Sequence, residues 1–348
     1  MRIRGVTRAR NLADRLSAPL RRQAAVLLYH RVVDSMFDPQ ELCVSCSHFS
    51  EHLEILRTRY RLLSLTELVD AARTRTLKKG TVAITFDDGY LDNLAFAKPL
   101  LERHRAPATV FAVSGGLESG MSFWWDRLER AVLWPGRLPE VLSLTIGGQT
   151  LQFPLGRWAQ LDREQFELLR GWTVSTSKDP TPRHTAYREI WQRLRVLPND
   201  AREELLRSLE SNRSDLSPLP GAARSLSTDE LRELADSAFI EIGAHTVHHE
   251  VLAALPPGRQ RNEIEDSRNA IAAALGRPVR TFSFPYGTPS DYTSETVRLV
   301  REAGFVCACA NFHGLVRHGA DAFQLPRVLV RDWDGDGFAR RLRIWIGG

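Results

Sequence analysis

Two adjacent carboxylates, Asp87 and Asp88, stand where a largely apolar run at residues 82–86 ends, and Gly89 follows them. In α/β sheets and barrels, catalytic side chains gather where strands run out into loops. Two neighbouring carboxylates repel each other unless a cation or a shared proton relieves the repulsion. One carboxylate could therefore hold a metal ion while the other moves protons. The alternative interpretation is a plain Asp-Asp-Gly turn that closes a hairpin.

Three histidines, His245, His248 and His249, follow a second strand-like run at residues 239–242. The first and last are four residues apart, a spacing that brings two imidazoles to one ion within a helical turn or a tight loop. Thr246 stands where a zincin protease would carry glutamate, which argues against that class. Two histidines and one aspartate give a three-ligand set with open positions, as a hydrolytic metal site requires. The two motifs together favour a metal site over packing histidines.

Two further strands are predicted at residues 281–287 and 304–311, and each runs into a polar turn or loop. Each follows a helix-like stretch, at residues 261–276 and 291–304, that carries an apolar face and ends in glycine. This alternation of helix, glycine, strand and turn predicts an α/β chain with a largely parallel sheet or barrel.

The motifs Thr85–Gly89, His245–His249 and Pro285–Tyr286 resemble those of the polysaccharide deacetylases, the NodB-homology group of carbohydrate esterase family 4. They occur in the family's order, each after a strand, and the resemblance runs from about residue 25 to about residue 333. It implies a distorted (β/α) barrel, here with a long and mostly helical insertion. It also implies removal of N- or O-acetyl groups from sugars with a divalent metal ion.

The resemblance implies a role for each matching residue. Asp87 would be the general base. Asp88, His245 and His249 would be the metal ligands. The backbone N–H of Tyr286 would join the metal in stabilising the oxyanion. The expected cofactor is one divalent ion, zinc in the first place, although cobalt and nickel also suit such a site.

Two positions depart from the family pattern. Ser283 stands where most members carry an arginine that orients the base, and Arg327 and Arg331 are the candidates for that role. The family's late Leu-x-His motif, which supplies the general acid, has no counterpart after Trp333. An acid is nevertheless needed, because an amide anion is a very poor leaving group.

His30 is the predicted general acid. It ends the run AVLLYH at residues 25–30, which resembles the Tyr-His strand of deacetylases that act on secreted poly-N-acetylglucosamine. The alternatives are His313 and His318, and His30 could instead be a packing residue beside the barrel mouth. His248 falls outside the ligand spacing and is expected beside the ligands or in solvent.

An insertion subdomain is predicted at about residues 117–225, because about a hundred residues separate the strand at 108–113 from the one that begins at Phe239. It should contain a hairpin and three helices, at residues 142–153, 162–172, 183–196 and 199–211. It follows a strand and should therefore lie on the catalytic face and shape the substrate groove. The residues predicted to bind substrate are Trp124, Trp125, Pro285 and Arg327. The two tryptophans could equally anchor the insertion's own core.

Composition limits the other function classes. The net charge is +5, but of 47 basic residues only four are lysine, which indicates a GC-rich bacterial genome rather than nucleic-acid binding. Four cysteines are too few for a disulfide framework in a chain of 348 residues, and buried free thiols are expected. Cys43 and Cys46, with Cys307 and Cys309, could alternatively form a zinc or redox site.

The segment before the predicted domain at residues 25–348 is basic. Residues 1–24 carry seven arginines, with leucines at 12, 16 and 20, and are predicted to form a helix or tail. Such a helix could lie on an anionic membrane surface or pack on the domain. Neither a secretory signal nor a transmembrane run of ~20 apolar residues is recognised. The expected location is therefore the cytoplasm or the periphery of the inner membrane.

The sequence thus predicts a hydrolase that acts on a carbon–nitrogen bond of an N-acetylated glycan or glycolipid of the bacterial cell envelope or an exopolysaccharide. A variant of this hypothesis places the reaction on a nucleotide- or lipid-linked sugar precursor. The competing hypothesis is a glycan-binding pseudoenzyme that has lost turnover.

Overall fold

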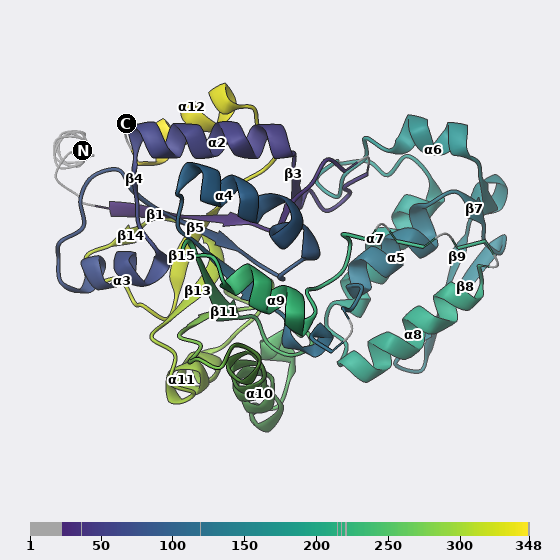
Figure 1. Ribbon diagram of the computed structural model, residues 1–348. Coiled ribbons are helices and arrows are strands. Elements are labelled where there is room, and N and C mark those ends of the chain that lie inside the picture. Colours follow the sequence, from purple (N-terminus) through teal and green to yellow (C-terminus); the bar gives the residue numbers. More distant parts are fainter. Residues whose placement is uncertain are drawn as a thin grey trace, which may run out of the picture.

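The computed structural model describes residues 23–35, 37–118, 120–213, 215–216, 218–219 and 221–346. In this part of the chain a barrel surrounded by helices lies beside a second, mostly helical lobe (Figure 1). The helix or tail predicted for residues 1–24 falls outside the described residues as far as residue 22, and the first strand begins at Gln23. Within the described ranges, no helix is both long enough and apolar enough to cross a membrane.

Seven parallel strands form the barrel, in the order β1-β15-β13-β12-β11-β6-β5. Their bounds are β1 (Gln23–Tyr29), β5 (Thr81–Phe86), β6 (Ala108–Ala112), β11 (Ile240–Ala244), β12 (Thr281–Ser283), β13 (Cys307–His313) and β15 (Leu325–Leu329). The ring closes because β1 pairs with β5, from Ala24 opposite Thr81 to Tyr29 opposite Phe86. Since the strands are parallel, their carboxyl ends meet at one mouth. The predicted (β/α) barrel is confirmed.

Continuous apolar runs build this barrel. Residues 24–29 of β1 have no exposed surface, which is typical of parallel strands covered on both faces. The short strands β4 (Arg61–Leu62) and β14 (Val316–Arg317) extend the sheet beside β5 and β1. β2 (Arg31–Val32) and β3 (Cys43–Val44) pair with each other just beyond the end of β1.

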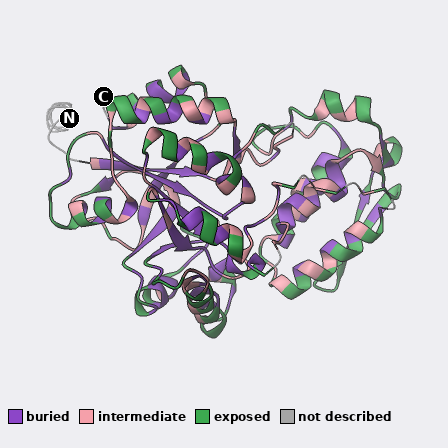
Figure 2. Ribbon diagram, viewed as in Figure 1, coloured by how far each residue is buried: buried purple, intermediate pink, exposed green. Residues whose placement is uncertain are grey.

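Helices cover the outside of the barrel. They are α2 (Cys46–Arg59), α3 (Leu65–Arg73), α4 (Lys98–His104), α9 (Thr228–Ala235), α10 (Pro257–Leu275), α11 (Ser294–Glu302) and α12 (Gly335–Ile346). Figure 2 shows their buried faces turned toward the strands and their exposed faces turned outward. A capping box of Ser64 and Glu67 begins α3, and Gly276, in the left-handed conformation, ends α10 where the sequence predicts the end of a helix.

The second lobe is the predicted insertion. Its elements are α5 (Trp124–Leu133), β7 (Gly136–Arg137), β8 (Val141–Ile146), β9 (Gln149–Pro154), β10 (Gln160–Leu161), α6 (Arg163–Leu169), α7 (Pro182–Leu194) and α8 (Asn199–Ser211). The hairpin β8–β9 and the helices α6, α7 and α8 match the elements expected from the sequence. A separate apolar cluster fills this lobe, with Leu128 and Ile190 among its fully buried members.

The four cysteines are free thiols, as expected. Cys43, Cys307 and Cys309 are buried, and Cys46 is half-buried at the start of α2. The groups of potential metal ligands found among the described residues contain histidine, aspartate and glutamate, and none of these thiols.

Candidate active site

The sequence motifs meet at the mouth of the barrel. Asp87 and Asp88 follow β5, and His245 follows β11, so these side chains leave the carboxyl ends of their strands. His30 directly follows β1, and Tyr286 belongs to the turn after β12. Barrel closure therefore brings together segments that are far apart in the sequence.

The backbone at these positions is unusual. Asp88, His249 and Tyr286 have positive φ values of 73°, 54° and 58°. Non-glycine residues adopt this conformation rarely, and such strain clusters at functional sites. Gly89 follows with a φ of +72°, and a Cβ there would lie 2.9 Å from the Cα of Ala112. The turn therefore needs glycine, and its left-handed geometry positions the Asp88 carboxylate.

Asp88, His245 and His249 form a compact, buried set of potential metal ligands. Oδ1 of Asp88 lies 3.6 Å from Nε2 of His245 and 3.3 Å from Nε2 of His249. All three ligand atoms lie within 4.8 Å of one another. His245 Nδ1 donates a hydrogen bond to the carbonyl of Ser283 at 2.7 Å, which leaves Nε2 without a proton and facing the site. One carboxylate and two imidazoles that converge in this way, with His245 oriented by its hydrogen bond to Ser283, fit a divalent cation.

Electrostatics keep the Asp88 carboxylate ionised. Burial by itself would raise the pKa of Asp88, but hydrogen bonds to His245 and His249 lower it by more, so the pKa lies well below its ordinary value. An ionised carboxylate is the form that binds a cation.

Asp87 is held by a buried arginine that comes from a different strand than the family pattern suggests. Arg327, in β15, donates from Nη1 to Oδ1 of Asp87 at 2.7 Å and from Nη2 to Oδ2 at 2.6 Å. Ser283 also donates its hydroxyl to Asp87, at 3.2 Å. Burial would raise the pKa of Asp87, but Arg327 and then His245 lower it below its ordinary value. Arg327 thus fills the space beside Ser283 and supplies the charge that the serine lacks.

Arg327 itself lies behind Asp87 and is not among the residues that line the cavity. Its Nε donates to the carbonyl of Ala310 at 2.7 Å, and its side chain is almost fully buried. Arg331, the other candidate, lines the cavity and donates to the backbone carbonyls of Gln40 and Glu41. Of the two, Arg327 is the arginine that contacts Asp87.

A cavity of about 270 Å³ opens above the two aspartates. Its lining includes Asp87, the three potential metal ligands, His30 and Tyr286. Burial lowers the pKa of His30, and the charges of Asp88 and Asp87 counteract this only in part. The alternative acids, His313 and His318, are not among the residues that line this cavity.

Comparison with known proteins identifies the domain. The family model described as polysaccharide deacetylase matches residues 74–133 and 205–308, which contain the Asp-Asp motif and both histidines of the potential metal site. The chain contains a polysaccharide deacetylase domain of the NodB type. The predicted hydrolase class is thereby confirmed. The family model leaves residues 134–204 unmatched, and these form most of the insertion.

Solved structures show the same fold at low sequence identity. A deacetylase from Streptococcus pyogenes, PplD, in complex with acetate superimposes with a TM-score of 0.57 at 16% identity, covering 92% of this chain and 99% of its own. IcaB from Ammonifex degensii gives 0.55 at 20% identity, covering 94% and 97%. A de-N-acetylase from Aggregatibacter actinomycetemcomitans gives 0.53 at 16% identity, covering 92% and 99%. No curated protein matches the sequence significantly.

The structure separates the two tryptophans of the insertion. Trp125 lines the deacetylase cavity, with its ring 4.8 Å from that of His249, and donates to the hydroxyl of Tyr90 at 2.6 Å. Trp124 packs in the core of the insertion, 5.7 Å from Trp191, and is not part of the lining. Pro285 is likewise absent from the lining, although the next residue contributes to it.

Residues that sequence reasoning missed complete the cavity wall. Trp191 and Arg195, one helical turn apart at the end of α7, both line it. The Arg195 guanidinium lies 4.4 Å from the centre of the Tyr286 ring and pairs with Asp291 at 2.5 Å. Burial raises the pKa of Tyr286 to about 12. The i, i+4 spacing of an aromatic and an arginine was the available signal, but such pairs are common on helices.

The insertion is hydrogen-bonded to the loop that carries the potential metal ligands His245 and His249. The N–H of Asn199 donates to Oε1 of Glu250 at 2.5 Å, and Arg202 donates to the carbonyl of His248 at 2.9 Å. On its other side, His248 Nδ1 lies 2.6 Å from Oε1 of Glu263. His248 therefore lies beside the ligands, in a polar network that links α8 and α10 to the site.

Proposed function

We propose that this protein is a metal-dependent hydrolase that removes an acetyl group from an N-acetylated sugar of a bacterial polysaccharide or of its lipid- or nucleotide-linked precursor. The observation that carries the proposal is the pairing of Asp87 with Arg327 directly beside the buried set Asp88, His245 and His249. A base held ionised next to a potential metal site, at the floor of a cavity, has the arrangement that hydrolysis requires.

Asp88, His245 and His249 would hold one divalent ion, zinc in the first place and cobalt or nickel as alternatives. When bound, the ion would polarise the acyl carbonyl and lower the pKa of a water molecule by several units. The protein's part is to keep the carboxylate ionised and the His245 ring oriented through its bond to the Ser283 carbonyl.

Proton transfer then falls to two residues that follow the neighbouring strands β5 and β1. Asp87 would take a proton from the attacking water, and its two bonds to Arg327 fix the orientation of the carboxylate during that step. His30 would give a proton to the departing amine, and its place in the cavity lining supports this role. Its lowered pKa makes the protonated ring a stronger acid but a less populated form near neutral pH, so the role rests on the position of His30 in the cavity.

The oxyanion would be stabilised by the backbone N–H of Tyr286, whose φ of 58° turns the peptide away from an extended path. The sugar would pack against the aromatic wall formed by Trp125 and Trp191, with Arg195 at its edge. The names of similar structures, a deacetylase with acetate bound and a de-N-acetylase, support acetyl as the acyl group and nitrogen as its carrier.

Acetate release tests the proposal. Zinc-loaded protein is incubated with N-acetylglucosamine oligomers and with lipid-linked and nucleotide-linked N-acetylglucosamine, and acetate is measured enzymatically. We expect release from at least one class of substrate and a loss of at least ~100-fold in the Asp87→Asn variant. If native protein and variant release acetate equally from every substrate, the hydrolase proposal fails. Glycan binding without turnover in that experiment would support the pseudoenzyme instead.

A further inference from the structure

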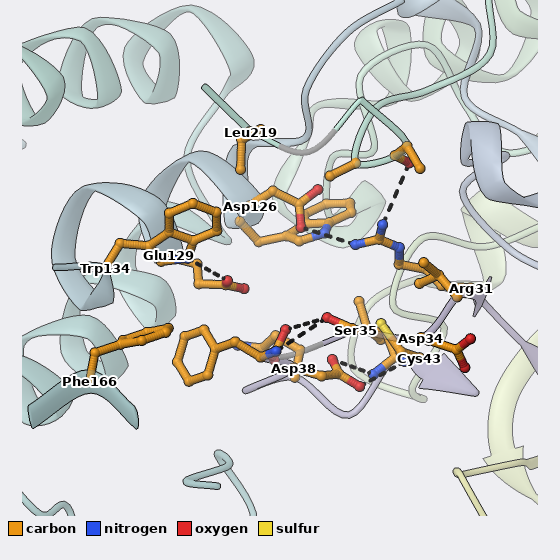
Figure 3. A pocket seen from close by; sticks show the side chains of 17 residues that line it. Arg31, Asp34, Ser35, Asp38, Cys43, Asp126, Glu129, Trp134, Phe166 and Leu219 are labelled. Atoms are coloured by element: carbon orange, nitrogen blue, oxygen red, sulfur yellow. Dashed lines mark hydrogen bonds and ion pairs between the residues drawn. The ribbon is translucent and has the colours of Figure 1, made fainter. Parts of the chain in front are cut away.

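A second cavity, also of about 270 Å³, lies beside the catalytic one (Figure 3). The loop after β1 and helix α5 of the insertion form two of its walls, so the barrel and the insertion both contribute to it. Gln40, Leu42 and Trp125 line both cavities. A molecule in the second cavity would therefore be a close neighbour of the group bound above Asp87.

Four acidic residues in the described part of the chain line this second cavity. One of them, Asp34, is exposed and accepts a hydrogen bond from the backbone of Cys46. Asp126 and Glu129 stand one helical turn apart on α5, and Asp38 faces them from the loop below (Figure 3). Glu129 accepts one hydrogen bond, from Nε1 of Trp134 at 3.0 Å. Asp38 accepts bonds from the backbone of the loop. None of these hydrogen-bond donors carries a positive charge.

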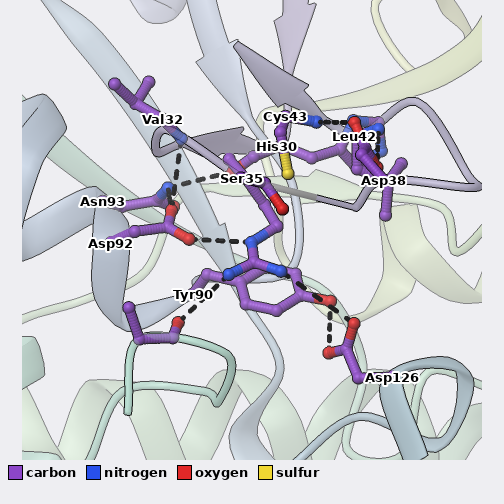
Figure 4. Close-up of polar contacts among 12 residues, drawn as sticks. His30, Val32, Ser35, Asp38, Leu42, Cys43, Tyr90, Asp92, Asn93 and Asp126 are labelled. Atoms are coloured by element: carbon purple, nitrogen blue, oxygen red, sulfur yellow. Dashed lines mark hydrogen bonds and ion pairs between the residues drawn. The ribbon is translucent and has the colours of Figure 1, made fainter. Parts of the chain in front are cut away.

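Arg31, the one arginine among the described residues of the lining, makes its shortest contacts with groups other than the three carboxylates on α5 and the loop. Its Nε donates to Asp92 at 2.8 Å, and its guanidinium lies 4.3 Å from the centre of the Tyr90 ring. Figure 4 shows this network, in which Tyr90 donates its hydroxyl to Oδ2 of Asp126 at 2.8 Å. Oδ1 of Asp126 lies 4.0 Å from Nη1 of Arg31, beyond hydrogen-bond distance, although Asp126 is only 5% exposed.

Asp126, which is buried, and Glu129, which is half-buried, are therefore short of positive charge. Burial raises the pKa of Asp126 to about 7, with only partial compensation from Arg31. Burial likewise raises the pKa of Glu129 well above its ordinary value, and the charge of Asp126 adds to the effect. A cation placed between them would relieve both the desolvation and the mutual repulsion.

The remaining wall suits a ring that carries such a cation. Trp134, Phe37 and Phe166 face the carboxylates, and the two phenylalanine rings pack edge to face at 5.2 Å. Aromatic faces bind sugar rings through their C–H surfaces and attract cationic groups. A small metal ion would leave this aromatic wall without a role, and a neutral N-acetyl group would leave the carboxylates unpaired.

We propose that the second cavity binds a glucosamine unit, with the protonated amine between Asp126 and Glu129 and the sugar ring against Trp134 and Phe166. This inference rests on the proposed function, because an amino sugar is what that reaction leaves behind. A chain that already carries one deacetylated unit would then be held with its next N-acetylated unit above Asp87. The deacetylase would recognise its own product as the neighbour of its next substrate.

Direct binding tests this without turnover. The full chain is titrated with the methyl glycosides of glucosamine and of N-acetylglucosamine, and the dissociation constants are measured by ligand-observed NMR. We expect the glucosaminide to bind at least tenfold more tightly, and the Glu129→Gln variant to weaken it at least tenfold, because a charge-assisted hydrogen bond is lost. Glutamine keeps the size of the side chain and its bond to Trp134.

Three controls separate the alternatives. Glu164→Gln, an exposed carboxylate on α6, and Asp87→Asn, in the catalytic cavity, should leave glucosaminide binding unchanged. Ethanolamine should compete at least tenfold more weakly than the glucosaminide, because it lacks the ring. If Glu129→Gln does not fold, Phe166→Ala should also weaken binding at least tenfold. The inference would be overturned if the two glycosides bind equally, or if ethanolamine competes as well as the glucosaminide. It would also be overturned if Asp87→Asn weakens glucosaminide binding and Glu129→Gln does not. Absence of acetate release would refute the proposed function and leave this result standing.

Discussion

Removing the arginine behind the base should cost much of the protein's stability. Arg327 and Asp87 make two short charge-assisted hydrogen bonds, and their side chains are 0% and 6% exposed. Breaking a buried pair by removing one partner leaves the other charge uncompensated, which costs about 3–5 kcal/mol. We therefore expect Arg327→Met to lower the free energy of unfolding by about that amount.

A double-mutant cycle isolates this pair from other effects. Asp87→Asn and Arg327→Met are combined, and the free energy of unfolding of each variant is measured by urea titration with circular dichroism. A chelator is present throughout, because a metal bound to the native state would add its own stabilisation. Since the double variant contains no buried unpaired charge at this position, its loss should be smaller than the sum of the single losses by about 2 kcal/mol.

Arg331 supplies the matched control for this cycle. It also lies at the mouth of the barrel, but its hydrogen bonds go to backbone carbonyls of the loop at residues 40–41. The Asp87→Asn and Arg331→Met changes should be additive within about 0.5 kcal/mol. Equal coupling in both cycles, or coupling below about 0.5 kcal/mol between Asp87 and Arg327, would refute the assignment of Arg327 as the partner of the base.

Three more predictions follow from buried groups near the barrel and the site. Burial lowers the pKa of His52 to about 4, below its value of about 6.5 in an unfolded chain. The unfolded chain therefore binds more protons than the folded chain between these two pKa values. The contribution of His52 to the free energy of unfolding should be complete above about pH 6.5 and should fall by about 3 kcal/mol toward pH 4. Urea titrations at both ends of this range check it, and an equal fall in His52→Gln would contradict it. Gly89→Ala should abolish acetate release. Gly89 has a positive φ, and the added Cβ would lie 2.9 Å from the Cα of Ala112. Normal acetate release by this variant would show that the turn does not need glycine. Arg202→Met should weaken zinc affinity about tenfold, measured by competition with a chelating dye. The change removes the hydrogen bond to the carbonyl of His248, which is next to His249 in the sequence. Unchanged zinc affinity would show that the insertion does not support the loop that carries the histidines.

Local patterns were enough to predict the segments that bear the site. Asp87, Asp88 and the two ligand histidines each follow an apolar run, and a buried parallel strand leaves that signature in the sequence. Since parallel strands must end at a common mouth, the convergence of these residues could be expected before any coordinates. The glycine after the two aspartates indicated the tight turn in the same way.

The partner of the base could not be derived from local pattern. Ser283 stands where the family pattern has an arginine, and the sequence offered Arg327 and Arg331 as candidates for its role. Only the closure of the barrel decides which strand supplies the side chain that reaches Asp87. β12 and β15 each pair with β13, so the distance from Ser283 to Arg327 depends on the register of three strands. Sequence spacing carries no such information.

The tryptophans show a second limit. Neighbouring aromatic residues at the start of a helix point in different directions, so Trp124 enters the core of the insertion while Trp125 reaches the catalytic cavity. The second cavity was also beyond prediction, because its walls come from a loop near residue 38 and a helix near residue 126, which approach only after the insertion folds against the barrel.

The central claim is that Asp88, His245 and His249 hold one divalent ion. Metal content measured by plasma mass spectrometry on tag-free protein, after reconstitution with zinc and desalting, tests it most directly. The account predicts about one equivalent in the native protein and in Asp87→Asn, and loss of that equivalent in both Asp88→Ala and His245→Ala. No bound metal in the native protein, or a full equivalent retained in both ligand variants, would contradict it.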